Sequence, residues 1–158
     1  LFMNFNISLY FLSLYFILSV FSIVSCTPES CREETEILAG ATFYKTGTGK
    51  ISAPDTLTFL GIGNEDSLLY NKALKISVIY IPLDMNKDTC RFALTINKES
   101  DTLTFIYSTY PHLISKECGY AFFHYLYECR FTKNILDTII IRNPVVTNKN
   151  EENIRIFF

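Results

Sequence analysis

An apolar residue at every second position is the pattern in this sequence that most restricts its fold. Runs with this alternation cover residues 74–80, 102–107 and 153–158. The clearest run alternates Cys90, Phe92, Leu94 and Ile96 with Arg91, Ala93 and Thr95. Successive side chains of a β-strand point to opposite sides of the sheet, so such a run has one apolar face and one polar face. Each run therefore predicts a half-buried strand.

Short polar segments separate these runs and supply the turns between strands, as at 47–49, 86–88 and 98–101. No long amphipathic helical pattern is visible, and only residues 66–74 could hold a helical turn. The aromatic segment 120–127 alternates less cleanly, which predicts a central strand with both faces covered. We predict an all-β domain, a β-sandwich of about seven to nine antiparallel strands, with a small barrel as the alternative.

The first 25 residues contain no charged side chain and no histidine. Such an apolar segment is a targeting element rather than part of a fold, so we interpret residues 1–25 as a signal peptide. Its end, Ile23-Val24-Ser25-Cys26, resembles the lipobox of bacterial lipoproteins. In that motif the signal peptidase cuts after the small residue, here Ser25. The thiol and the new amine of Cys26 then carry lipid, including palmitate.

Two other interpretations of this leader remain open. One is an ordinary signal peptide that ends beside a cysteine. The other is an uncleaved membrane anchor, because residues 7–24 just span a bilayer core about 30 Å thick. The basic residues that normally open a signal peptide are missing before Met3, so we expect that the natural start lies elsewhere.

A lipidated Cys26 would divide the remaining chain into a tether and a domain. Residues 26–36 hold the cysteine and an acidic tether, and residues 37–158 form the β-sandwich domain. The net charge is only −2, and Lys and Arg are dispersed, which argues against a nucleic-acid partner. We expect a protein held in outer-membrane lipid by acylated Cys26. It would face the periplasm or the cell surface.

Four cysteines follow the lipidated one: Cys31, Cys90, Cys118 and Cys129. An even number in an exported chain predicts two disulfides, and the sequence leaves all three pairings open. Free buried thiols are the alternative. No CxxC spacing is present, so we do not expect these cysteines to bind a metal.

A series of short segments also stands in a distinctive order along the chain. They are Gly61-Ile-Gly63-Asn64 with Leu69-Tyr70, Ile81-Pro82-Leu83-Asp84, Asp88-Thr89 with Phe92, Asp101–Tyr107, Ser115–Gly119, Val146-Thr147-Asn148 and Asn153–Ile156. Together they resemble an uncharacterised family of Bacteroidota lipoproteins over residues 31–156. The resemblance implies a lipoprotein of the outer membrane or periplasm, and it implies no catalytic activity.

The same resemblance bears on the cysteines. In that family's pattern a cysteine near the tether and another just before Gly119 recur. The resemblance therefore implies a Cys31–Cys118 disulfide and leaves Cys90 to pair with Cys129.

Four Asp-Ser/Thr-aliphatic triplets resemble the O-glycosylation sequon of the Bacteroidota periplasm. The hydroxyl residues that they offer are Thr56, Ser67, Thr102 and Thr138. Asp followed by Thr and an aliphatic residue is also how a strand commonly leaves a turn, so the triplets have a purely structural interpretation. Mass spectrometry showing all four peptides unmodified would exclude glycosylation.

No nucleophile, acid–base pair or metal cluster stands out, so we expect a non-enzymatic binding or structural module with no cofactor. Its partner would be an envelope protein or a glycan. The aromatic residues that could contact a glycan, if exposed, are Tyr44, Tyr70, Tyr107, Tyr110 and Tyr120.

Two alternatives remain for the function. One is an envelope hydrolase that uses carboxylates such as Asp84, Asp88 and Glu117, which would need two of them about 5–10 Å apart in one pocket. The other is a pilus-like subunit, whose incomplete sheet would accept a donated strand.

Overall fold

A computed structural model describes residues 31, 35–63 and 67–158 of this chain. The chain divides into two units, Leu1–Cys31 and Arg32–Phe158, and the second unit is the subject below. The predicted signal peptide, the lipobox with Cys26 and most of the tether lie outside the described residues. Within the described residues, no helix is long and apolar enough to cross a membrane.

The described residues are all-β, as the alternating pattern predicts, and they contain ten strands. The strands are β1 (Leu38–Tyr44), β2 (Thr56–Gly61), β3 (Leu68–Leu74), β4 (Val78–Pro82), β5 (Thr89–Ile96), β6 (Glu99–Ser115), β7 (Gly119–Phe131), β8 (Thr138–Ile141), β9 (Val145–Val146) and β10 (Glu152–Phe157). The expectation of a helical turn at 66–74 is wrong. Residues 68–74 pair with β2 as a strand, from Thr56↔Leu74 to Leu60↔Leu68.

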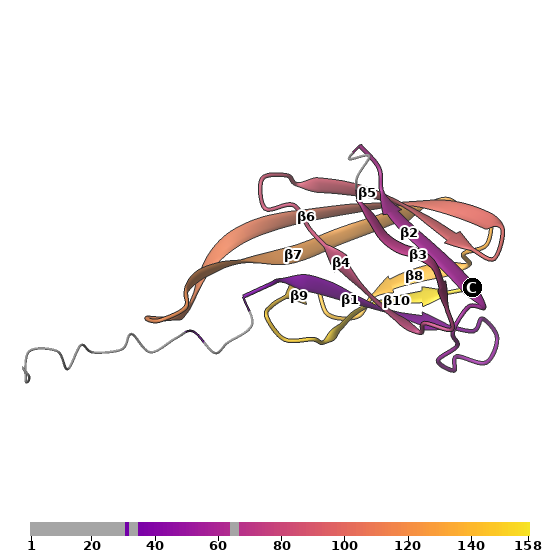
Figure 1. Ribbon diagram of the computed structural model, residues 1–158, viewed down its shortest axis with the longest axis horizontal. Helices are drawn as coiled ribbons and strands as arrows, with labels where there is room; N and C mark the ends of the chain where they lie inside the picture. Colours follow the sequence, from indigo (N-terminus) through magenta and orange to yellow (C-terminus); the bar gives the residue numbers. More distant parts are fainter. Residues whose placement is uncertain (1–30, 32–34, 64–66) are drawn as a thin grey trace, which may run out of the picture. The chain divides into compact units, whose positions relative to one another are not determined.

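Two sheets face each other and form the predicted sandwich (Figure 1). Sheet A has the strand order β4-β1-β10-β8, and sheet B has the order β3-β2-β5-β6-β7-β9. One pair departs from the antiparallel expectation, because β1 and β10 run parallel, from Gly40↔Glu152 to Tyr44↔Phe157. The first and last strands of the domain are therefore neighbours at the centre of sheet A.

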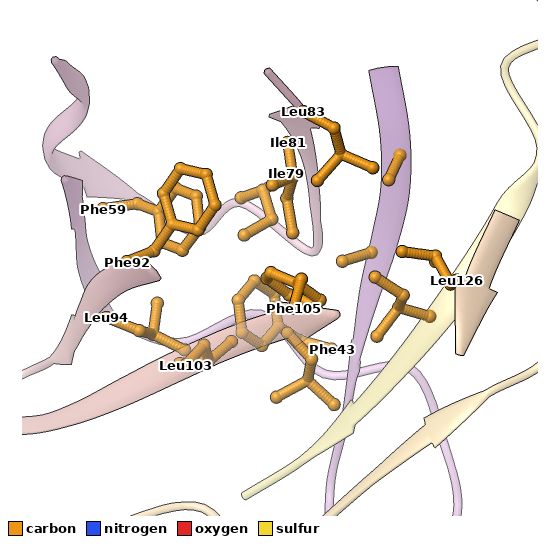
Figure 2. Packing of buried hydrophobic residues seen from close by; sticks show 14 of the residues in the cluster. Phe43, Phe59, Ile79, Ile81, Leu83, Phe92, Leu94, Leu103, Phe105 and Leu126 are labelled. Atoms are coloured by element: carbon orange, nitrogen blue, oxygen red, sulfur yellow. The ribbon is translucent and has the colours of Figure 1, made fainter. Parts of the chain in front are cut away.

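The core lies between the sheets and is built from the alternating residues. Phe92, Leu94 and Ile96 of β5 are buried beside Leu103 and Phe105 of the neighbouring strand β6. Figure 2 labels Phe92, Leu94, Leu103 and Phe105 in one cluster with side chains from β1 and β4 of sheet A, and Ile96 belongs to the same cluster. The pattern at 90–96 is therefore confirmed, and each inward residue contributes about 1.5–3 kcal/mol through removal from water.

Two buried polar side chains tie loops to the sheets. The carboxylate of Asp101, at the start of β6, accepts hydrogen bonds from the Thr132 hydroxyl and from the backbone N–H groups of residues 134–136. The Asn153 amide of β10 accepts from the Gly40 N–H and donates to the carbonyls of Asn143 and Val145. Buried polar groups need such partners, so both side chains fix the backbone around them.

The longest hairpin extends past the rest of both sheets (Figure 1). Its strands β6 and β7 have 17 and 13 residues, and they stay paired out to Ser115↔Gly119. We call the outer part of this hairpin, Thr109–Ser115 with Gly119–His124, the arm. The prediction that residues 120–127 form a strand between two others is confirmed. The expectation that both of its faces are covered is wrong, because Tyr120, Phe122 and Tyr127 are exposed.

Candidate binding surface

Of the three carboxylates proposed for a hydrolase, Asp84 lines one cleft and Asp88 lines another. Asp84 and Asp88 flank the loop between β4 and β5, whereas Glu117 lies in the turn of the arm. Asp84 forms an ion pair of 3.1 Å with Lys87. The backbone N–H of Asn86 and then the Lys87 ammonium lower the pKa of Asp84. A carboxylate held ionised in this way does not serve as a general acid at neutral pH.

A cleft of about 390 Å³ opens beside this loop. Its polar lining includes Asp84, Lys87, Cys90 and Arg91, and its apolar lining includes Leu83 and Phe92. The Tyr107 hydroxyl donates to the Asp84 carbonyl at 2.8 Å, so the Cys90 thiol, 2.9 Å away, donates to the Tyr107 oxygen. In this chain of hydrogen bonds the Cys90 thiol is a structural donor. The pKa of Tyr107 is raised, and burial is the largest cause.

The five tyrosines predicted as glycan contacts fall into two groups. Tyr107 is buried, the Tyr44 hydroxyl donates to Glu152 at 2.6 Å, and the Tyr70 hydroxyl accepts from the backbone N–H of Tyr80. Tyr110 and Tyr120 remain exposed on the arm. The structure therefore leaves two of the five predicted residues available to a ligand.

One face of the hairpin carries a group of exposed tyrosines, of which the sequence predicted Tyr110 but not Tyr125 or Tyr127. Tyr110, Tyr125 and Tyr127, which we call the tyrosine patch, lie on or beside the arm. Tyr125 and Tyr127 have ring centroids 5.1 Å apart, and the Tyr127 hydroxyl lies 3.0 Å from the Ser108 oxygen. Tyr110 packs edge-on against Phe123. These contacts hold the rings in place before any ligand arrives.

The opposite face of the arm continues the core-facing side of sheet B. Tyr107 and Leu126 are paired and buried, and from there the same face passes through Thr109 and His124 to the end of the arm. It ends in Leu113, Tyr120 and Phe122, whose exposed fractions are 50%, 68% and 43%. We call these three residues the apolar tip. The core face thus runs on past the point where described residues cover it.

The buried His124 lies where covered and uncovered parts of this face meet. Its Nδ1 is 2.9 Å from the Thr109 hydroxyl oxygen, and its ring packs edge-on against Tyr107. Burial lowers the pKa of His124 from its ordinary value of 6.5. The folded protein therefore binds a proton at His124 less readily than the unfolded chain does.

This shift predicts a pH-dependent stability. The unfolded chain takes up the proton at about pH 6.5, so the stability is full above that pH and decreases as the pH falls towards the folded pKa. Urea unfolding of the wild type between pH 5 and pH 7.5 should show this decrease in the free energy of unfolding, because histidine side chains titrate in this range. The variant His124→Gln should remove it. If the free energy of unfolding of His124→Gln depended on pH as strongly as that of the wild type, the pH dependence would not come from His124.

The cysteines follow only part of the predicted pattern. Cys31 and Cys118 are both disulfide-bonded, in agreement with the Cys31–Cys118 pairing. Cys90 and Cys129 are free thiols, so the second predicted disulfide is wrong. Both pair with Phe105, one from each side of β6. They are thus two strand spacings or about 9.5 Å apart, beyond the roughly 7 Å that a disulfide allows between Cα atoms.

The four candidate glycosylation sites differ in exposure. Thr138 at the start of β8 is exposed, whereas Thr56, Ser67 and Thr102 are half-buried. The aspartate that precedes Thr102 is the buried Asp101, whose oxygens are occupied by the loop that follows β7. Thr138 is therefore the site that an enzyme would reach most easily, and modification stays a prediction.

A comparison with protein-family models places most of this domain in one family. The model described as "Family of unknown function (DUF6452)" matches residues 56–158, from the start of β2 to the end of the chain. The matched region contains the cleft, the tyrosine patch and the apolar tip. Neither a curated protein nor a solved structure is similar enough to this chain to match it.

Proposed function

We propose that this chain, which belongs to the DUF6452 family of unknown function, is a membrane-anchored envelope lipoprotein whose β-sandwich is a non-catalytic binding module. The lipobox-like Ile23–Cys26 and the preceding uncharged segment support the anchor and a Bacteroidota type of lipoprotein. Disulfide-bonded Cys31 and Cys118 support an oxidising compartment such as the periplasm. Lipid would hold the protein to the outer membrane through Cys26.

The tyrosine patch is the observation that carries the binding part of this proposal. Tyrosine offers a large apolar ring and a hydroxyl, and it loses little conformational entropy on binding, so binding surfaces are enriched in it. The neighbouring charges are already neutralised, because Arg130 and Glu128 form an ion pair of 2.9 Å. A surface of this kind favours an uncharged partner, either a glycan or the polar–apolar surface of an envelope protein.

The two alternatives have less support. A carboxylate hydrolase would need two acidic groups in one pocket, and of the three candidates only Asp84 lines the 390 Å³ cleft. A pilus-like subunit would need a core groove that waits for a donated strand. In the described residues sheet A is continuous from β4 to β8, and the core residues are buried.

A double substitution tests the tyrosine patch. In cells that make Tyr125→Ala/Tyr127→Ala, affinity for the partner should fall by at least about 30-fold, because a single buried interface tyrosine can contribute about 2 kcal/mol. The measurement is chemical crosslinking of intact cells followed by purification of the lipoprotein and mass spectrometry, with co-sedimentation on purified cell-wall glycan as the second assay.

Tyr80→Ala is the control, because Tyr80 is a tyrosine on β4 of sheet A that is about as exposed as Tyr125. The control should retain wild-type crosslinks and glycan binding. Equal loss in both variants, or no loss in the double variant, would refute the patch as the binding site. The anchor is tested separately by feeding cells labelled palmitate and comparing the wild type with Cys26→Ala.

A further inference from the structure

The apolar tip is a continuous surface at the end of the arm. Leu113 and Tyr120 are paired across the hairpin, and Phe122 is two residues along the same strand, so all three side chains share one face. Pro111 is paired with Phe122 and extends this face towards the core. An apolar face that continues a protein core without cover normally has a partner.

A disulfide-bonded cysteine in the turn of the arm restricts what this partner is. Cys118 lies two residues before Tyr120 and is disulfide-bonded, in agreement with the pairing to Cys31. Cys31 follows Cys26 by five residues. Five residues span at most about 18 Å, so lipid on Cys26 would keep the end of the arm within a few tens of ångströms of the bilayer.

We propose that the apolar tip docks onto the membrane that holds the lipid anchor, with Leu113, Tyr120 and Phe122 in the interfacial layer. The inference rests on the proposed function, because it requires lipid on Cys26. Lipid and tip then make two attachments to one bilayer, so the domain has a fixed orientation on the membrane. The tyrosine patch, on the opposite face of the hairpin, remains open to its partner.

The side chains of the tip suit this position. Tyrosine concentrates at membrane–water interfaces, where its ring contacts acyl chains and its hydroxyl remains hydrated. Leucine and phenylalanine commonly form the apolar face of segments that lie in this layer. The turn at the end of the arm carries Lys116 and Glu117, both exposed, so it brings no net charge. Attachment should therefore depend on apolar contact and respond little to salt.

The absence of tryptophan from the chain makes the test direct. Tyr120→Trp places a single tryptophan in the tip, and Leu74→Trp places one at the end of β3. Leu74 is 69% exposed, close to the 68% of Tyr120. Leu74 is paired with Thr56, and this pair lies near the start of β6. Tyr120 is paired with Leu113, near the end of β6. That length of strand separates the two probes by roughly 45 Å.

Both full-length variants are purified from cells with their lipid and reconstituted into vesicles of phosphatidylethanolamine and phosphatidylglycerol that contain brominated phosphatidylcholine. Bromine quenches tryptophan only at close range, so quenching at position 120 should exceed that at position 74 about threefold or more, with a blue-shifted emission. Adding Leu113→Asp to the Tyr120→Trp variant should reduce its quenching to the level of position 74.

Palmitate incorporation, measured on the same preparations, distinguishes the two possible failures. Labelled protein with equal quenching at both positions would overturn the docking of the tip and leave the anchor intact. Protein without palmitate would overturn the anchor and this inference together. Quenching at position 120 that persists in Leu113→Asp would also overturn it, because the apolar face would then not be responsible.

Discussion

Replacing Asp101 by alanine is expected to lower the free energy of unfolding by about 4 kcal/mol. The Asp101 side chain is buried and accepts four hydrogen bonds, from the Thr132 hydroxyl and from the N–H groups of Asn134, Ile135 and Leu136. Alanine leaves these donors without an acceptor. It also releases the loop that places Leu136 in the core.

Urea unfolding followed by circular dichroism measures this loss. Asp137→Ala is the matched control, because Asp137 is an exposed aspartate in the same loop. The control should change the free energy of unfolding by less than about 0.5 kcal/mol. A loss in Asp101→Ala as small as that of the control would show that water or another group replaces the carboxylate.

The same carboxylate affects acid stability. Desolvation is the largest single influence and raises the pKa of Asp101. The hydrogen bonds from Thr132 and the three N–H groups together outweigh it, so the pKa is lowered from its ordinary 3.8. The stabilisation is therefore present above the unfolded pKa and is lost as the pH falls through the folded pKa. As the pH falls through that range, Asp101→Asn should lose less stability than the wild type.

Gly40→Ala is expected to cost about 3 kcal/mol or more, because an added Cβ would overlap backbone that cannot move away. It would lie 2.3 Å from the carbonyl oxygen of Glu151, at the register shift between β1 and β10. The N–H of Gly40 also donates to the buried Asn153. Relief of the overlap would separate the two central strands of sheet A.

Gly61→Ala provides the comparison for Gly40→Ala. Its Cβ would also meet an atom at 2.3 Å, but that atom is the side-chain hydroxyl of Ser67, which can rotate. We expect a loss of about 1 kcal/mol in Gly61→Ala. Thermal unfolding of both variants gives the comparison. Equal losses would mean that the β1–β10 junction adjusts as easily as the Ser67 side chain.

The sequence predicts those features of the fold that depend on residues close together along the chain. Alternation identifies Phe92, Leu94 and Ile96 as one buried face, because the period of a strand is local. It does not predict that β1 and β10 run parallel, since that pairing joins residues more than a hundred positions apart. Nor does it reveal that β6 separates Cys90 from Cys129, because strand order and register are not properties of a single segment.

The candidate surfaces were harder to predict for a different reason. The segment around Phe122 and Tyr125 is apolar on both faces, and this composition is typical of a strand that is covered on both sides. Coverage depends on how far the second sheet reaches, which no local pattern contains. Only the mixture of tyrosine with phenylalanine was a signal, since a wholly buried strand would favour aliphatic residues over hydroxyl-bearing ones.

The parallel pairing of β1 with β10 has a consequence for how the protein is made. β1 has five buried residues in its seven, and it is synthesised more than a hundred residues before its central partner β10. Contacts so distant in sequence form slowly, and unfinished sheets aggregate. A newly made chain would thus depend on chaperones to hold β1 until β10 has been synthesised.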